Sequence, residues 1–471
     1  MVIKNVIKDY KNKENPSKIE WIILFLIIII LFYSYMYWDM VITTRHGINV
    51  WYSLTSGDIR DFYMNNLKPP ISRFASSSAS YPFSVYIVFA IWDFPLWVME
   101  AFFHKDPFLS TWALLYGKTI LLPFLIGSAY VLSKICKELS FSKNYTKWFI
   151  FYFMSSCLVF YAMLLLCQYD ILSLLFTLIG LYYYINGNFK KFLLFFAIAI
   201  SFKFFALLIF IPLILLYEKR ILRIIFYTIC SYGICILYSL FFNMPKEVGS
   251  HMINLLRFTF VMNLPFLGLN VPMFITINVI FWIFCYMKKP KGNLTNLTLY
   301  ISFVSFAIFF TLSKTYGYWI ILIVPYLCIF CFSNKEYRKL AMIIETVLSS
   351  VFVFNEIGIS KFFTLGRFAS NAALPNIFGK IKENSFGMSF SDFLSEKLNN
   401  ETLFSFIPPT CFAIFVGCIF MFGYINYYMI KPSNMNNNDD EEIIYRSVIL
   451  IRLLINTIIC SLLIFLFFYT K

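Results

Sequence analysis

Charged and metal-binding side chains are scarce in this sequence. Asp, Glu, Lys and Arg together make up only 13% of the 471 residues. The three histidines, His46, His104 and His251, are scattered, so no catalytic metal site can be assembled from local spacing. The eleven cysteines lie mostly inside apolar segments without paired spacing, which excludes a disulfide framework. No small-residue cleavage site follows the first apolar run, Trp21 to Tyr37, so this run is predicted to be an uncleaved span.

Apolar residues dominate instead. They make up 60% of the chain, which has 58 Phe and a mean hydropathy of +0.74. No soluble fold has enough interior for so much apolar surface, so the sequence predicts an all-α, polytopic transmembrane helical bundle. The net charge of +15 comes mainly from Lys and Arg in short turns between apolar runs. Membrane topology and anionic headgroups explain these residues, and we expect membrane lipids but no nucleic acid as partners.

The positive-inside rule predicts the orientation of the N-terminal part. Residues 1–20 form a Lys-rich hydrophilic arm, which we expect in the cytoplasm. The first span then ends outside at Trp38-Asp39 and is followed by an outer segment that continues to Pro82. This segment is predicted to form short interfacial helices, with four aromatic residues at the level of the headgroups. These residues are Trp51, Tyr52, Phe62 and Tyr63.

The run from Tyr81 to Phe103 is long enough to span, but we predict that it does not cross. It contains Asp93, Pro95 and Glu100. If it crossed, the lysines between residues 134 and 147 would lie outside, against the positive-inside rule. The run is therefore interpreted as re-entrant or interfacial.

Counted with the first span, the other apolar runs give about eleven spans. The further spans are predicted at Thr111–Leu132, Trp148–Leu166, Ile171–Ile185, Ile221–Phe242, Phe274–Tyr286, Leu297–Ser313, Ile320–Phe332, Met342–Phe354, Phe404–Tyr428 and Val448–Phe468. A second large outer loop is expected from Asn355 to about Glu401. Residues 431–471 are interpreted as an acidic inner loop, NMNNNDDEE, and the last transmembrane helix.

One stretch does not fit a simple span. The segment between Lys191 and Glu218 is short, yet the turns on both sides are basic and should face the cytoplasm. A helix needs about 20 residues to cross the hydrocarbon core, so two crossings do not fit into this segment. We therefore predict a broken hairpin, in which one short helix rises to Lys203 and another descends through Pro212. A turn at that depth must be buried in protein or line a wet cavity.

These residues carry a family resemblance. The stretch has Gln168 and Asp170 at the outer start of a helix, then a basic inner turn, Lys203 in mid-segment and Pro212 in an apolar run. This order of features resembles the GT-C superfamily of polyprenyl-phosphate-sugar-dependent glycosyltransferases. The likeness is greatest to the glycosylphosphatidylinositol mannosyltransferase and its bacterial relatives. It covers the stretch from Tyr161 to Arg223 well and the remainder of the chain only by the order of features. It implies a GT-C transmembrane catalytic domain over residues 21–430.

The resemblance also implies roles for acidic residues. The essential acidic residue of the family lies in the first outer loop, and this role falls on Asp39 as general base for an acceptor hydroxyl. Asp39 is alternatively an interfacial residue that caps a helix. Asp58 and Asp61 are weaker candidates for the same role. Asp170 is expected to act as a second acidic or acceptor-positioning group, or simply as the N-cap of its helix.

Basic and aromatic residues are the candidates for binding the donor phosphate. Lys203 is expected to neutralise the phosphate leaving group, or else to snorkel to an interface. Lys314 and Tyr316 occupy the position of a later outer turn, where the family commonly has His or Glu, and are otherwise interface anchors. Arg257 is a further phosphate candidate, or a solvated loop residue. No metal ligands are assigned. Family members differ in their use of a divalent cation such as Mg²⁺ or Mn²⁺, so this stays open.

The sequence thus leads to an expected function with two alternatives. The first is an inverting transfer of a hexose-type sugar from a polyprenyl-phosphate donor to a lipid-linked or cell-envelope glycan acceptor on the outer face. The second is a flippase or exporter of lipid-linked oligosaccharides, although no internal repeat is evident. The third is a polysaccharide polymerase or ligase. We expect a multi-pass protein of a cell membrane with a cytoplasmic N-terminus, and heavy use of Ile, Lys, Asn, Phe and Tyr favours a bacterial plasma membrane.

Overall fold

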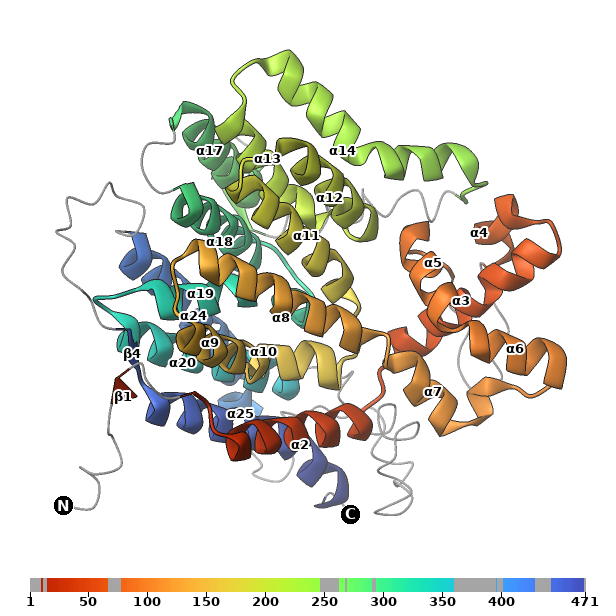
Figure 1. Cartoon of the computed structure of the whole chain (residues 1–471), viewed down its shortest axis with the longest axis horizontal. Coiled ribbons are helices and arrows are strands. Elements are labelled where there is room, and N and C mark those ends of the chain that lie inside the picture. Colours follow the sequence, from red (N-terminus) through yellow and green to blue (C-terminus); the bar gives the residue numbers. More distant parts are fainter. Residues whose placement is uncertain are drawn as a thin grey trace.

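The computed structural model describes residues 10–11, 15–66, 78–245, 262–266, 269–289, 294–359, 395, 401–427 and 442–469. Nearly all regular structure in these ranges is helical, which confirms the predicted all-α class (Figure 1). The helices are α2 (Lys18–Ser34), α3 (Trp38–Thr55), η1 (Ile59–Asp61), α4 (Phe62–Asn65), α5 (Phe83–Trp92), α6 (Phe94–Phe103), η2 (Pro107–Leu109), α7 (Thr111–Lys118), α8 (Leu121–Glu138), α9 (Lys143–Met154), α10 (Cys157–Val159), η3 (Phe160–Leu165), α11 (Asp170–Ile185), α12 (Phe189–Phe202), η4 (Phe204–Ala206), α13 (Leu207–Tyr217), α14 (Ile221–Phe241), α17 (Met273–Met287), α18 (Leu294–Leu312), η5 (Gly317–Leu322), α19 (Val324–Ser333), α20 (Arg338–Ile359), α24 (Glu401–Tyr427) and α25 (Arg446–Tyr469).

The strands in the described ranges are very short. They are β1 (Tyr10–Lys11), β2 (Asn263–Phe266), β3 (Leu269–Pro272) and β4 (Ile443–Ile444). β1 pairs with β4 and β2 pairs with β3, both antiparallel. The β1–β4 pair brings the N-terminal arm beside the segment that precedes α25. These two segments therefore lie on the same side of the bundle, as the predicted topology requires.

Helix α2 illustrates how the sequence specifies a span. It begins at a capping box, in which the Ser17 hydroxyl accepts from the Glu20 amide at 3.2 Å and the Glu20 carboxylate accepts from the Ser17 amide at 2.6 Å. Its 17 residues cover about 25 Å, close to the thickness of the hydrocarbon core. Leu24 and Leu31 are buried while Ile22 and Phe25 are exposed. One face of α2 therefore packs on the bundle and the other suits lipid.

Several helical segments are long and apolar enough to cross a membrane. Five such segments occur in the described residues, and up to eight if each of three bent helix pairs counts as one span. The five are Thr111–Glu138, Ile221–Phe241, Leu294–Leu312, Arg338–Ile357 and Ser405–Tyr427. They confirm the predicted multi-pass membrane protein. The number of about eleven spans and the side of the N-terminus stay predictions.

The run from Phe83 to Phe103 is not one continuous helix. Helices α5 and α6 meet at Asp93 and are bent by 66°. Helices α3 to α7 form a group at one end of the molecule, beside the larger bundle (Figure 1). The break agrees with a segment that does not cross in a straight line, and its re-entrant or interfacial placement stays a prediction.

Phe62 and Tyr63, predicted at the level of the headgroups, do not face the outside of the protein. Both side chains are fully buried in a small apolar cluster with Phe83, Tyr86 and Phe242. The periodicity of a short segment does not reveal this, because the partners come from α5 and from the residue that follows α14. The segment after α3 therefore contributes to a small core of its own.

The chain breaks at Lys203 and folds back, as the broken hairpin predicts, and the placement of its ends relative to the membrane stays a prediction. α12 ends at Phe202, Lys203 has an extended backbone (φ −156°, ψ 121°), and the chain resumes in η4 and α13. At the other end, the rings of Phe189 and Tyr217 stack with centroids 4.1 Å apart, so the start of α12 lies beside the end of α13. Phe192 and Phe210 make a second ring contact between the two helices.

A buried ion pair connects three helices of the bundle. Arg452 in α25 donates from Nε and Nη2 to the Glu345 carboxylate in α20, at 2.6 and 2.7 Å, and neither side chain is exposed. Tyr152 in α9 donates to the same carboxylate at 2.6 Å, and Ser155 accepts from Arg452 at 3.1 Å. Because the charges are paired and hydrogen-bonded, burial at this depth is tolerated.

Candidate functional site

Four interruptions of the helices meet at one end of the bundle. They are the break after α2, the turn between η3 and α11, the break at Lys203 and the turn before η5. Contacts from Asp39 to Gln168, from Asp170 to Lys203 and from Lys203 to Trp319 join them. Irregular backbone in a membrane bundle occurs where it is buried in protein or lines a cavity. This end of the bundle is therefore the candidate functional site.

Lys203 and Asp170 form an ion pair. The distance from Lys203 Nζ to Asp170 Oδ1 is 2.8 Å, and the side chains are 12% and 0% exposed. Lys203 does not snorkel, because its ammonium lies at the break of the hairpin beside a buried carboxylate. An ammonium has three N–H donors, and such a cation can also meet an anionic ligand.

Asp170 does not cap α11, so the capping alternative is wrong. The N-cap residue is Tyr169, which makes no side-chain capping bond, and Asp170 is the first residue of the helix. A carboxylate in the first turn is still favoured by the helix dipole. Its charged partner is tertiary, because Lys203 follows α12 in the chain.

Asp39 lies in the first turn of α3, so it belongs to a helix and not to a loop. The 74° bend between α2 and α3 takes α3 away from the axis of the first span, and we take Asp39 to lie outside that span. Gln168 donates to Asp39 Oδ2 over a long 3.5 Å. Burial raises the pKa of Asp39, the Gln168 hydrogen bond and the Lys203 charge lower it, and the Asp170 charge raises it.

Aromatic rings surround the Lys203 ammonium. Nζ lies 5.0 Å from the ring centroid of Tyr81, 5.6 Å from Tyr169, 6.0 Å from Phe205 and 5.9 Å from Trp319. Rings at this distance attract a cation through their negative faces. The rings come from four separate segments and limit the directions in which the ammonium can meet a ligand.

Tyr316 and Lys314 lie near this cluster but not in it. Tyr316 is exposed, stacks on Tyr318 at 5.5 Å and packs against Trp319 at 5.1 Å. It is thus one ring away from Lys203. Lys314 is exposed in the segment between α18 and η5. Both are exposed, so a ligand that reaches this end of the bundle can contact them.

Asp58 does not join the cluster in the described structure. Asp58 is exposed and lies beyond the far end of α3 from Asp39. The 18 residues of α3 separate the two carboxylates by about 27 Å. Arg257 lies outside the described residues, as does His251.

Glu356 was missed by the sequence reasoning. It lies near the end of α20 and accepts a hydrogen bond from Tyr161 at 3.3 Å. Gly317 makes room for it, because a Cβ at that position would overlap the Glu356 carboxylate. The signal in the sequence was an acidic residue just after the apolar run 342–354. Tyr318 ties this region to the cluster, since its ring contacts Tyr37, close to Asp39 in the chain.

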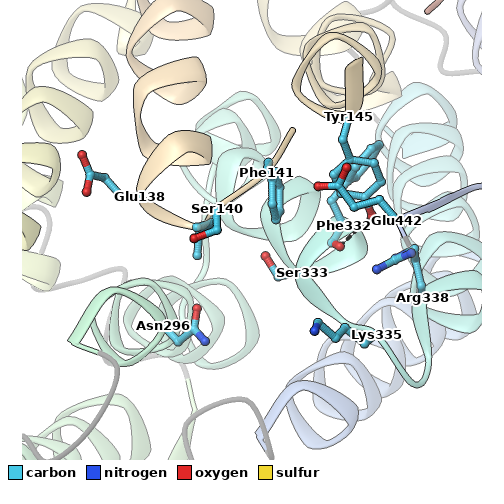
Figure 2. Close-up of a pocket in the computed structure, with 11 residues that line it drawn as sticks. Glu138, Ser140, Phe141, Tyr145, Asn296, Phe332, Ser333, Lys335, Arg338 and Glu442 are labelled. Atoms are coloured by element: carbon cyan, nitrogen blue, oxygen red, sulfur yellow. Dashed lines mark hydrogen bonds between the residues drawn. The ribbon is translucent and has the colours of Figure 1, made fainter. Parts of the chain in front are cut away.

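A separate cavity lies at the other end of the bundle (Figure 2). It has a volume of about 310 Å³ and is lined by the α8–α9 turn, the α19–α20 turn and the start of α18. Asn296 lies at this end of α18, whereas Phe309 near its other end packs on Trp319. Lys335 and Arg338 extend toward the cavity from the same side (Figure 2). Arg338 also donates to the Ile443 carbonyl at 3.1 Å, so it helps to hold the chain together.

In the described part of the chain, no group of three or more His, Cys, Asp and Glu side chains is arranged to hold a metal ion. Asp39 and Asp170 both border the cluster, and Asp170 is already paired with Lys203. We therefore derive no chemical step through a metal.

Neither protein-family models nor curated protein sequences match this chain. The cluster itself and the residues that carry the resemblance are what indicate a function.

The cluster combines groups suited to group transfer. Asp39 is partly buried, and an ionised carboxylate can accept a proton. Lys203 is a cation held in a fixed position by Asp170 and by aromatic rings. A base and a cation in one site can activate a hydroxyl and stabilise an anionic leaving group.

Proposed function

We propose that this protein is an integral-membrane glycosyltransferase of GT-C architecture. It takes a hexose-type sugar from a polyprenyl-phosphate donor and attaches it to a lipid-linked or cell-envelope glycan on the outer face. The observation that carries the proposal is the joining of Asp39, Gln168, Asp170 and Lys203 in one cluster. Gln168, Asp170 and Lys203 are among the residues on which the family resemblance rests, and the resemblance implies the role of base for Asp39.

The reaction is a single displacement. The acceptor hydroxyl oxygen forms a bond to the anomeric carbon while the bond from that carbon to the phosphate oxygen breaks. The hydroxyl proton goes to the Asp39 carboxylate, and the polyprenyl phosphate leaves with the electron pair. One displacement inverts the anomeric centre, and no second carboxylate nucleophile is needed.

Lys203 would act on the leaving group. As the bond to the phosphate oxygen breaks, negative charge grows on the phosphate, and a fixed ammonium stabilises it more in the transition state than before. Asp170 keeps that ammonium in place through the 2.8 Å contact. Tyr316 and Lys314 are exposed next to the cluster and suit contacts to the donor.

The test is sugar transfer by purified protein in lipid vesicles, using a panel of polyprenyl-phosphate sugars and membrane glycan acceptors. We expect Asp39→Asn to lower turnover by about 10²- to 10⁴-fold, the usual contribution of a general base, while donor binding survives. Glu138→Gln is the matched control, because Glu138 is exposed at the other end of the bundle.

Other outcomes would decide against the proposal. Absence of transfer from every donor, together with passage of labelled lipid-linked oligosaccharide across the vesicle membrane, would replace the enzyme with a flippase. Joining of whole oligosaccharides without use of a monosaccharide donor would instead indicate a polymerase or ligase.

A further inference from the structure

Lys118, the last residue of α7, is fully buried among backbone carbonyl groups. Its ammonium donates to the carbonyl of Phe32, to that of Tyr35 at 2.6 Å and to that of Leu164 at 2.8 Å. The three donors of an ammonium thus meet three acceptors. Its Nζ also lies 4.4 Å from the ring centroid of Phe32.

These acceptors belong to two separate segments. Phe32 and Tyr35 are at the C-terminal end of α2, where carbonyl groups have no partner within the helix. Leu164 lies in the π-helical turn η3, which precedes α11. Asp39 follows closely after Tyr35 in the chain, and Gln168 follows closely after Leu164. Lys118 therefore ties together the two backbones that carry the hydrogen-bonded pair Asp39 and Gln168.

A second contact links the same segments. The Cys167 thiol donates to the carbonyl of Tyr35 at 3.8 Å and to that of Leu165 at 3.4 Å. Cys167 has φ 52°, in the left-handed region that residues with a Cβ rarely adopt. A turn in this conformation persists only where its surroundings hold it. The contacts of Lys118 and Cys167 with the end of α2 provide that support.

We propose that Lys118 is a positioning residue, whose ammonium clamps the end of α2 to the η3–α11 turn and so sets the contact between Asp39 and Gln168. It touches neither the donor nor the acceptor. The effect of the clamp on catalysis rests on the proposed function, whereas the contacts that form the clamp do not. The clamp acts by geometry, since a catalytic group that moves by about 1 Å can lose a hundredfold in rate.

Lys219 offers a matched structural control. Its ammonium also collects backbone carbonyls, those of Leu215 at 2.7 Å and Tyr286 at 2.6 Å, and so joins the ends of α13 and α17. It lies beyond the end of α13 that is remote from Lys203. Lys219 is only partly buried, and its loss removes a carbonyl-bound ammonium without touching the Asp39 region.

The experiment compares Lys118→Met and Lys219→Met in the full chain in lipid nanodiscs. We expect both to lower the melting temperature, but only Lys118→Met to lower kcat/KM by about tenfold or more and to move its acid limb to higher pH. Gln168→Ala should move the acid limb of kcat/KM in the same direction. The double variant Gln168→Ala with Lys118→Met should move the acid limb no further than Gln168→Ala alone. Lys118→Gln keeps two N–H donors and carries the test if the Met variant does not fold.

An activity-free measurement separates the two proposals. The titration of the Asp39 carboxyl is followed by ¹³C NMR of Asp-labelled protein, with the signal assigned by its loss in Asp39→Asn. A raised pKa of Asp39 in Lys118→Met, in protein that transfers no sugar, would support the clamp and contradict the proposed glycosyltransferase function. An Asp39 titration and kcat/KM profile that match wild type, with only a lower melting temperature, would overturn the clamp.

Discussion

Lys203 and Asp170 are paired at 2.8 Å, although one lies at the break of the α12–α13 hairpin and the other in the first turn of α11. The pair has two consequences. It compensates the cost of a cation among buried rings, and it places a negative charge beside the group that is proposed to meet a phosphate. Asp170 therefore orients Lys203 but competes with an anionic donor for it.

This competition predicts opposite effects of two substitutions on donor affinity. Lys203→Ala removes the cation and should raise the dissociation constant of a polyprenyl-phosphate sugar by at least about tenfold, as expected for a charged hydrogen bond of about 1.5–3 kcal/mol. Asp170→Asn removes the competing charge and should lower the dissociation constant of the donor. The measurement is donor binding in nanodiscs, with exposed Lys137→Ala as control. Weaker binding in both variants would mean that the pair serves only the fold.

Gln168→Ala should change the pH dependence of transfer. A general base works when ionised, so activity is lost as pH falls through the pKa of Asp39. Burial raises this pKa and the Gln168 hydrogen bond lowers it, so removal of Gln168 raises it further. The acid limb of kcat/KM should move to higher pH.

The pH profile needs a control with a similar amide. Asn186 is exposed at the end of α11 opposite Asp170, and Asn186→Ala should leave the limb in place. An unchanged profile in Gln168→Ala would remove Asp39 from the role of base. Several titratable groups act electrostatically on Asp39 and are kept unchanged in both variants. They are Asp170, Lys203, Tyr81, Tyr86, Tyr169 and Tyr318.

Arg452→Met should destabilise the bundle by about 3–5 kcal/mol, because it leaves the Glu345 carboxylate buried without its partner. The double variant Arg452→Met with Glu345→Leu should recover part of this loss. Thermal unfolding in detergent measures both. Arg223→Met breaks an exposed ion pair with Glu218 and should change the unfolding temperature little. Equal losses in the single and double variants would contradict the assignment of the cost to an unpaired charge.

Gly180→Ala should destabilise the contact between α11 and α12. A Cβ at Gly180 would lie 2.5 Å from Cδ2 of the buried Phe196 ring, so the ring or the helix must shift. Overpacking of this kind costs about 1–3 kcal/mol. Gly233→Ala is the control, since a Cβ there meets nothing within 4 Å, and the better helix propensity of Ala favours the variant. An unchanged melting temperature in Gly180→Ala would show that the two helices separate without cost.

The hairpin was predictable because it follows from local quantities. Both turns are basic, at Lys190-Lys191 and Lys219-Arg220, and the segment between them is too short for two membrane helices. A hairpin that turns back before crossing is the arrangement that fits. The roles that the family resemblance implies for Asp39, Asp170 and Lys203 require the three residues to share one site. Its chemistry stays a proposal, while its geometry is visible in the contacts.

The helical class, the apolar spans and the position of the hairpin break were determined by the sequence itself, because hydropathy, charge and helix length act over short stretches of chain. The ion pair of Asp170, the clamp made by Lys118 and the pairing of Arg452 with Glu345 were decided only by the tertiary structure. In each, the partners lie on different helices or turns that are distant in the chain, and a local pattern does not tell a helix cap from a long-range ion pair. Only the packing of the helices selects the partner, because a buried charge is stable where an opposite charge or enough carbonyl groups meet it.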